Sequence, residues 1–264
     1  PGHRKWFEHD RSQNWLAREY AWNMLAGLDQ GAVLFTNGDN DTFPIWYLQE
    51  VEGFRRDVTV MNLSLVNLPW YTQQMRRRDP QLPLSFSDEQ IERLEPRAYE
   101  DRQTGQRGIV WVRDYIVNDV VTTNRQRPQP RPVFFAVTIP RENMERYYPF
   151  LQMEGLAFRL TEQRRRDNEP GVDPERLLRN MYGAYDYTAL FDGDTRARWS
   201  AYHEAAGLPL DVANGGRPSL PPAPLSANAA ARLDYPRLAG LLGEKRTDVY
   251  RDQNTTNLLG NYTI

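Results

Sequence analysis

The stretch AVLFTNGDNDTFPIWY, residues 32–47, decides the fold of this chain. Its first five residues form a continuous apolar run bounded by polar turn residues, which is typical of a strand covered on both faces. Residues 37–42 form a turn-rich loop, and residues 43–51 have an aromatic helical pattern with Pro44 in the first turn. Residues 57–63 predict a second strand. A strand, a helix and a strand within about thirty residues predict a parallel pair joined by a crossover helix.

The other patterns of residues 1–190 extend this pair into an α/β domain. We expect helices at 13–28, 70–78, 88–94, 114–123 and 142–148, and strands at 109–113, 133–139 and 151–160. Gly155 is expected as a bulge in the last of these strands. Ser87 and Asp173 occupy positions typical of helix N-caps, with Pro174 opening the helix after Asp173. Together these elements predict one three-layer unit with a mostly parallel sheet.

The composition changes from residue 161, and we expect a second region at 191–264. It holds a short helix at 199–206 and then an extended arm. The segment NGGRPSLPPAP, residues 214–224, combines a turn with a polyproline-like chain that cannot build a helix or sheet interior. Few large apolar residues follow, so this tail is expected to order only against another surface. The chain begins at Pro1 without a signal-peptide pattern, which indicates a piece of a longer product.

Composition excludes several classes of protein. The 264 residues contain no cysteine, which excludes disulfide frameworks, thiolate nucleophiles and Cys-ligated metal sites. No apolar run approaches the roughly 18 residues that a membrane span needs, so we expect no span in this chain. The 33 basic and 35 acidic residues nearly cancel, which argues against nucleic acid as a partner. All basic residues except Lys5 and Lys245 are arginines, which suit planar pairing at interfaces, although a GC-rich genome would give the same bias.

Asp39 and Asp41 are the candidate metal-binding residues. They follow a buried parallel strand, and paired carboxylates at such a strand end can hold Mg²⁺ or Mn²⁺ against a diphosphate. The spacing does not fit a phosphatase of the haloacid dehalogenase type, because Thr42 follows Asp41 directly. The alternative is an Asx-rich turn that satisfies its own backbone and caps the next helix. We favour this structural interpretation over metal binding.

No other pattern predicts catalysis or a cofactor. His3, His9 and His203 lack the spacing of a zinc site, and no phosphate-binding or dinucleotide-binding glycine loop is present. His9 lies beside Asp10, but no serine elbow accompanies this pair. We therefore predict no catalytic residue, no cofactor and no bound nucleotide.

Aromatic side chains divide into two groups along the sequence. The early group is expected mostly in the core because of its helical spacing: Trp6, Trp15, Trp22, Trp46, Tyr47, Trp70 and Tyr71. Trp and Tyr beside Arg are also frequent anchors of protein interfaces and of sugar-stacking surfaces. On that basis the candidate partner-binding residues are Tyr182, Tyr185, Tyr187, Trp199, Arg217, Pro221, Pro222, Tyr250 and Tyr262.

Several long strings resemble one protein family. They are HDRS (9–12), AREYA (17–21), LFTNGDNDTFPIWYLQ (34–49), VEG (51–53) and NLSL (62–65). They are similar to the periplasmic C-terminal domain of bacterial membrane proteins that are themselves similar to protein O-mannosyltransferases. The resemblance is dense over residues 8–75, continues to residue 160 and is faint near 252–262. It implies that the catalytic acid belongs to a membrane domain absent from this chain, so no catalytic residue carries over.

Two functions follow from this resemblance. The first is a non-catalytic extrinsic subunit that docks on and stabilises an integral membrane protein complex at the periplasmic face of a bacterial inner membrane, with contact to the membrane surface left open. As a soluble family domain without its membrane part, the chain also resembles the extrinsic stabilising subunit of bacterial reaction-centre and light-harvesting photosystems. The alternative is a periplasmic acceptor-binding or carbohydrate-binding domain of a glycosyltransferase that uses lipid-linked sugars.

Overall fold

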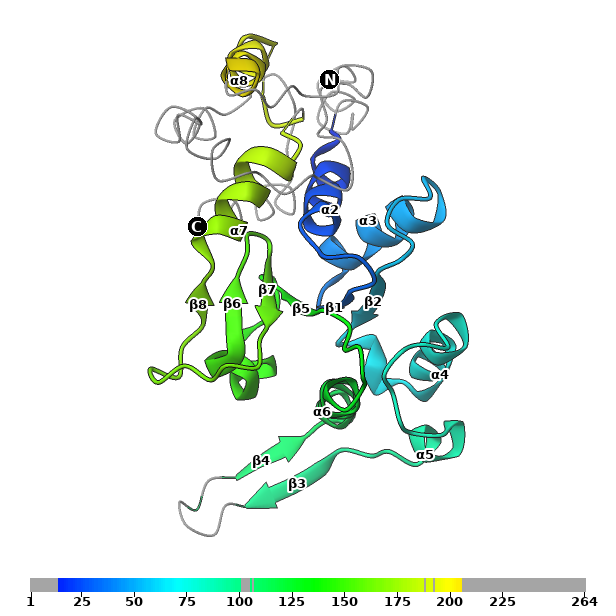
Figure 1. Ribbon diagram of the computed structural model, residues 1–264. Coiled ribbons are helices and arrows are strands. Elements are labelled where there is room, and N and C mark those ends of the chain that lie inside the picture. Colours follow the sequence, from blue (N-terminus) through cyan, green and yellow to red (C-terminus); the bar gives the residue numbers. More distant parts are fainter. Residues whose placement is uncertain (1–13, 101–104, 106, 188, 192, 206–264) are drawn as a thin grey trace, which may run out of the picture.

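A computed structural model describes residues 14–100, 105, 107–187, 189–191 and 193–205 (Figure 1). The Pro-rich segment 214–224 and the rest of the predicted arm lie outside the described residues. Among the helices of the described part, none combines the length and the apolar character needed to cross a membrane.

A six-stranded sheet forms the centre of the molecule, in the order β2-β1-β5-β7-β6-β8. Strands β1 (Val33–Thr36), β2 (Thr59–Asn62) and β5 (Val133–Ala136) run parallel, and β6 (Leu151–Met153) pairs in parallel with β8 (Gly171–Val172). Only β7 (Ala157–Leu160) runs antiparallel to its neighbours β5 and β6. The prediction of an α/β fold with a mostly parallel sheet is confirmed.

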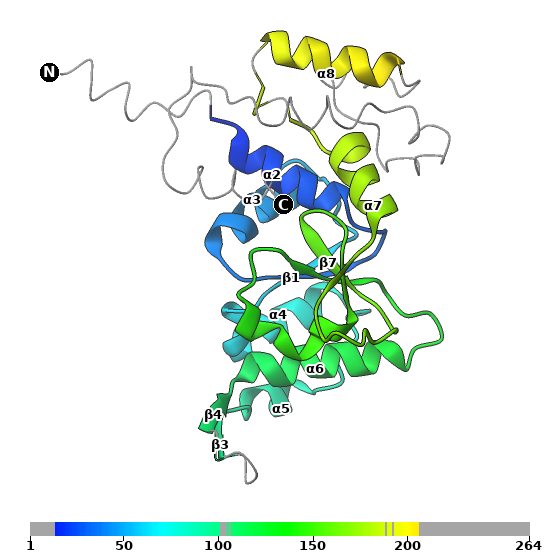
Figure 2. The ribbon, with the colours of Figure 1, turned by 90° about the vertical axis from the view of Figure 1, so that its left-hand side faces the viewer.

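Helices cover both faces of this sheet and complete three layers (Figures 1 and 2). One face carries α2 (Leu16–Ala26), α3 (Asp39–Glu50) and α7 (Pro174–Arg179). The other face carries α4 (Pro69–Arg78), α5 (Asp88–Glu92) and α6 (Val112–Arg125). All four residues of β1 and of β5 are buried, as expected for strands covered on both sides, and Phe35 of β1 packs on Phe135 of β5 with ring centroids 5.0 Å apart.

Helix α3 begins earlier than predicted. Residues 39–42 belong to its first turn instead of a loop, its N-cap is Gly38, and no side chain caps it. Pro44 therefore lies inside the helix, where it cannot donate to the carbonyl of Asn40 one turn before. The helix tolerates this because Asn40 is exposed, so water can satisfy that carbonyl.

The predicted strand 151–160 is two strands. Gly155 sits in the turn between β6 and β7 with φ of +118°, so it reverses the chain instead of forming a bulge. The predicted helix 142–148 is a pair of 3-10 turns, η2 (Arg141–Asn143) and η3 (Glu145–Phe150), separated at Met144, whose φ of −136° is not helical. The sequence analysis also missed β8, which has only two residues.

A hairpin stands outside the central sheet. Strand β4 (Arg107–Val110) pairs antiparallel with β3 (Arg97–Glu100), which was not predicted. Every residue of β3 is exposed, and Figure 1 shows the hairpin extending away from the body beyond α6. Alternation of apolar and polar residues is weak here, and for that reason periodicity did not identify β3.

The last described elements pack onto the body. As predicted, the Asp173 side chain caps α7 by accepting from the Arg176 amide at 3.1 Å. The π-helical turn η4 (Asn180–Ala184) and α8 (Gly193–Ala205) follow. Trp199 of α8 packs on Tyr187 with ring centroids 5.0 Å apart, so the packed body continues past residue 190.

Candidate functional site

Polar side chains gather where the parallel strands β1, β2 and β5 end. This set, called the carboxyl-edge cluster, consists of Thr36, Asn37, Asp41, Thr42, Asn62, Thr138 and Asn143. In open α/β sheets, ligands bind outside the carboxyl ends of the strands where the connections leave in opposite directions. The position between β1 and β5 is such a point. The chain leaves β1 toward β2 on one side of it, and leaves β5 toward β7 and β6 on the other side. The cluster is therefore the candidate functional site.

Asp41 is the buried acceptor at the centre of this cluster, with 1% of its surface exposed. Its Oδ2 accepts a short hydrogen bond from the Thr138 hydroxyl, and Oδ1 accepts from Thr42 Oγ1 at 3.1 Å. The Asn37 amide lies 3.4 Å from Oδ2. Asp41 thus ties the start of α3 to the segment after β5, which supports the structural interpretation of this residue.

Asn62 connects β2 to the same cluster. Its Nδ2 donates to Thr42 Oγ1 at 2.9 Å, and its Oδ1 accepts from the amides of Ser64 and Leu65 at 2.9 and 3.0 Å. The Asn62 backbone amide donates to the hydroxyl of Tyr71 at 3.0 Å. Burial raises the pKa of Tyr71 to about 12, so this hydroxyl remains protonated.

The outer part of the site offers neutral hydrogen-bonding groups and one carboxylate. Asn143 Nδ2 donates to Asn37 Oδ1 at 3.1 Å, and both side chains are partly exposed. Asp39, Asn40 and Ser64 are exposed around them. Asp39 and Asp41 do not face one ligand position together, since one is exposed and the other is engaged by two threonines. In the described part of the chain, no three His, Asp or Glu side chains form a group that could hold a metal ion.

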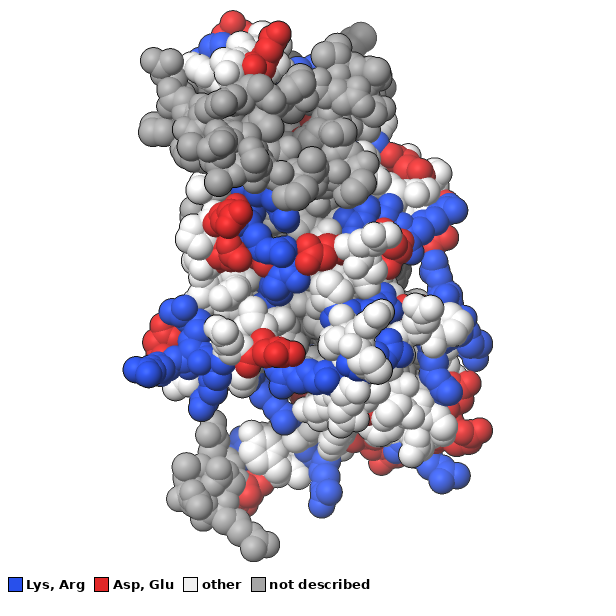
Figure 3. All heavy atoms as spheres, viewed as in Figure 1, with Lys and Arg blue, Asp and Glu red and all other residues white. Residues whose placement is uncertain are grey.

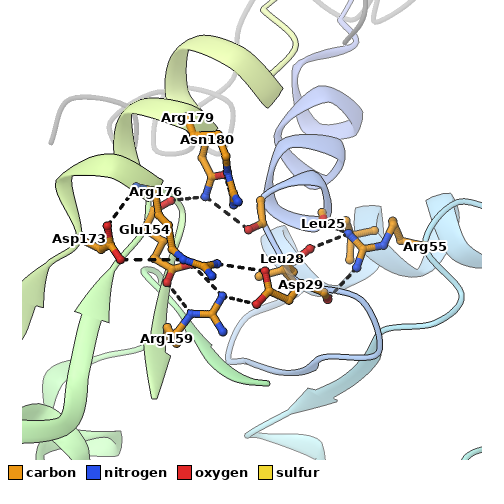
Figure 4. Close-up of polar contacts among 11 residues, drawn as sticks. Leu25, Leu28, Asp29, Arg55, Glu154, Arg159, Asp173, Arg176, Arg179 and Asn180 are labelled. Atoms are coloured by element: carbon orange, nitrogen blue, oxygen red, sulfur yellow. Dashed lines mark hydrogen bonds and ion pairs between the residues drawn. The ribbon is translucent and has the colours of Figure 1, made fainter. Parts of the chain in front are cut away.

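A second polar network joins α2, the β6–β7 turn and α7 (Figure 4). Arg159 bonds the buried carboxylate of Glu154 and donates to Asp29 Oδ2 at 2.6 Å. Arg176 donates to Asp29 Oδ1 at 3.0 Å and lies 3.5 Å from Glu154 Oε2. Asn180 Nδ2 donates to the backbone carbonyls of Glu154 and Gly27. These partners are satisfied within the chain, and the network therefore has a structural role.

Electrostatics support this structural role. Burial by itself would raise the pKa of Asp29, but attraction to Arg159 and Arg176 lowers it below its usual value. Burial and the neighbouring Arg176 charge lower the pKa of Arg179. Over the face shown in Figure 3, basic and acidic side chains are interspersed, with no large region of one sign. This face therefore lacks the basic stripe that polyphosphate binding needs.

The structure buries four of the predicted partner-binding residues. Tyr182, Tyr185, Tyr187 and Trp199 are 9%, 4%, 3% and 4% exposed. They pack against one another and against the body, with the Tyr185 hydroxyl accepting from the Leu156 amide at 2.9 Å. In this structure they are core residues and not exposed anchors, because α8 adds apolar surface that the sequence analysis did not include in the body. The remaining predicted residues, Arg217, Pro221, Pro222, Tyr250 and Tyr262, lie outside the described part.

The histidines contribute no site in the described residues. His203 is buried in α8, with Nδ1 2.9 Å from the carbonyl of Trp199 and Nε2 against the carbonyl of Tyr182. Burial lowers the pKa of His203. His3 and His9 lie outside the described residues.

Sequence reasoning missed Asn62, Thr138 and Asn143, which complete the carboxyl-edge cluster. Asn62 is the last residue of β2 and Thr138 lies shortly after β5, so both lie near the carboxyl ends of the strands predicted at 57–63 and 133–139. That position was the available signal, because the carboxyl ends of parallel strands meet at one edge of a sheet. Asn143 gave no such signal, since it lies in a 3-10 turn predicted as a helix.

Two comparisons with known proteins match part of the chain. Residues 17–129 match the family model described as TMEM260-associated domain 2. A stretch of 71 residues is 30% identical to the mouse protein O-mannosyl-transferase TMEM260, covering 27% of this chain and 10% of that protein. No solved structure matches the chain. The family-model match runs from α2 past the end of α6, and includes every residue of the carboxyl-edge cluster except Thr138 and Asn143.

Proposed function

We propose that this chain is a non-catalytic accessory domain of a glycosyltransferase-like membrane protein, and that it binds carbohydrate or acceptor at the periplasmic side. The single observation that carries this proposal is the match of residues 17–129 to a TMEM260-associated domain, because that region contains most residues of the candidate site. The similarity to a protein named as an O-mannosyl-transferase supports the class of reaction that the domain would assist.

The geometry of the site supports binding. Its outer groups are amides, a hydroxyl and a carboxylate, which exchange hydrogen bonds with sugar hydroxyls or with a polypeptide backbone. Its inner groups are tied to one another and hold the outer groups in place. A transferase gains rate when a binding domain holds the acceptor near the reacting atoms, and this contribution requires no catalytic residue here.

Calorimetric titration of the full chain tests this proposal. The titrants are methyl α-mannopyranoside and a Ser/Thr-rich acceptor peptide. We expect binding of at least one, and a clear loss of its heat signal in the Asp39→Ala/Asn40→Ala double variant. Glu175→Ala, an exposed carboxylate on α7, is the matched control. The proposal is rejected if neither titrant binds the unmodified chain.

The β3–β4 hairpin favours a second candidate function, docking on an integral membrane protein complex. Tyr99 and Ile109 are each 50% exposed on this two-stranded ribbon, and an isolated ribbon gains stability from a partner. Neither match concerns a photosynthetic complex, so the proposed partner is a membrane protein of the transferase-like class. Purification of the native protein should recover this partner with the unmodified chain but not with Tyr99→Ser/Ile109→Ser. Equal recovery with both chains would reject docking through the hairpin.

A further inference from the structure

Exposed aromatic side chains gather on α3 and α4 at the β2 end of the sheet. Phe43, Tyr47 and Trp70 are 50%, 45% and 54% exposed, and Trp46 is half-buried among them. These four residues are called the aromatic surface. From the helical spacing, we expected the tryptophans and Tyr47 mostly in the core. In the structure, the buried side of α3 instead carries Ile45, Leu48 and Gln49. The exposed rings of Phe43 and Tyr47 therefore lie outside the core, whereas Trp46 is partly buried and packs against it.

Ring contacts connect Phe43, Trp46 and Trp70 through the buried ring of Tyr71. Phe43 and Trp46 have ring centroids 5.5 Å apart, and Trp46 lies 6.4 Å from Tyr71. Tyr71 is 2% exposed, contacts Trp70 at 5.8 Å and is fixed by the hydrogen bond from the Asn62 amide. The exposed rings thus rest on a buried ring, which reduces the entropy lost when a ligand binds to them.

Polar side chains border the aromatic surface on both sides. Asp39 and Asn40 are exposed at the start of α3, and Asp39 lies one helical turn before Phe43. At the other end Glu50 lies one turn after Trp46 and pairs with Arg78 of α4. Arg78 is the cation of this border and its charge is paired with Glu50, so the border disfavours phosphate groups and the anionic surface of a membrane. Flat apolar rings beside amide and carboxylate groups fit a neutral ligand that has both an apolar face and hydroxyl groups.

We infer that the aromatic surface binds a pyranose sugar, with the C–H face of the ring stacked on Trp70 and its hydroxyls bonded to the polar border. This inference rests on the proposed function and places its carbohydrate site on α3 and α4. An aromatic surface left bare would promote non-specific association, and a bound sugar covers it without burying a charge.

Saturation-transfer NMR and titration of the full chain with methyl glucosides, galactosides and mannosides test the inference. We expect transfer to the C–H protons of one sugar face, and about tenfold weaker binding for Trp70→Ala. Trp70→Phe retains a ring and should recover most of the affinity. Trp15→Ala is the matched control, since Trp15 is 56% exposed on α2 and outside the aromatic surface. Because Trp70 is largely exposed, its substitution leaves the fold intact.

The outcomes separate this inference from the proposed function. If a methyl glycoside binds equally well to the unmodified chain and to Trp70→Ala and Phe43→Ala, the sugar site lies elsewhere and only the inference fails. If no glycoside binds but the acceptor peptide does, the inference fails and the accessory role stands. If phosphatidylcholine vesicles retain the chain through Trp70 and no glycoside binds, the surface is a membrane contact and the inference is overturned.

Discussion

At the scale of single residues, Asp39 and Asp41 show how neighbours in one turn differ in role. Both were candidates from the same sequence pattern. The structure exposes Asp39 and buries Asp41 beneath three hydrogen-bond donors. A carboxylate that serves several donors stabilises the fold, whereas its exposed neighbour is available for a ligand.

Asp41→Ala should lower the free energy of unfolding by about 1–3 kcal/mol, because Thr138, Thr42 and the Asn37 amide lose their acceptor. Urea denaturation followed by circular dichroism measures this change. Asp39→Ala is the control, and its effect should stay below about 1 kcal/mol, the limit for a charge in the first turn of a helix. Equal effects of the two substitutions would show that Asp41 is not the structural member of the pair.

At the scale of elements, strong periodicity identified most of the central unit. The predicted strands 57–63 and 133–139 and the helices 13–28, 70–78 and 114–123 all have counterparts in the structure. The predicted element boundaries were wrong where a single residue, and not a periodic pattern, determines where a helix or strand begins or ends. Gly38 caps α3 through its backbone conformation, and Gly155 turns the chain through a positive φ, and neither is visible as an apolar pattern. The candidate site was found only in part, because it is assembled from three strand ends far apart in the sequence.

Gly155→Ala should destabilise the fold by about 3 kcal/mol. The new Cβ would overlap the Tyr185 hydroxyl, and alanine would be strained at φ of +118°. Gly31 provides the control, because it also has a positive φ, +68°, but nothing lies within 4 Å of an added Cβ. Gly31→Ala should therefore cost only about 1–2 kcal/mol of conformational strain. Thermal unfolding of both variants distinguishes backbone strain from steric overlap. A similar loss of stability in the two variants would exclude the overlap with the Tyr185 hydroxyl.

At the scale of the whole molecule, the predicted boundary at residue 190 separates segments that the structure packs together. Before this boundary, Asn23 of α2 already exchanges two hydrogen bonds with the Asp186 backbone, at 2.6 and 2.7 Å. Trp199 then contacts Tyr182, Tyr187 and Phe191 from α8. Sequence reasoning could not find this contact, because a change in composition carries no information on long-range packing.

Trp199→Ala should lower the stability of the whole body by about 3–5 kcal/mol, since a fully packed aromatic ring leaves a cavity. Unfolding followed both by far-ultraviolet circular dichroism and by fluorescence of the remaining tryptophans should shift together as one transition. Trp15→Ala, which removes an exposed ring, should shift neither signal by more than about 0.5 kcal/mol. A body transition unchanged by Trp199→Ala would support the predicted boundary at residue 190.

The hydroxyl of Tyr71 has a further consequence at this scale. The backbone of an edge strand is a template on which a strand from another molecule can assemble. At edge strand β2, the Asn62 amide is already engaged by Tyr71, and the opposite edge strand, β8, has only two residues. These two features reduce the backbone that the central sheet offers to a strand from another molecule, whereas β3 and β4 form a sheet of only two strands in which each strand has an outer edge.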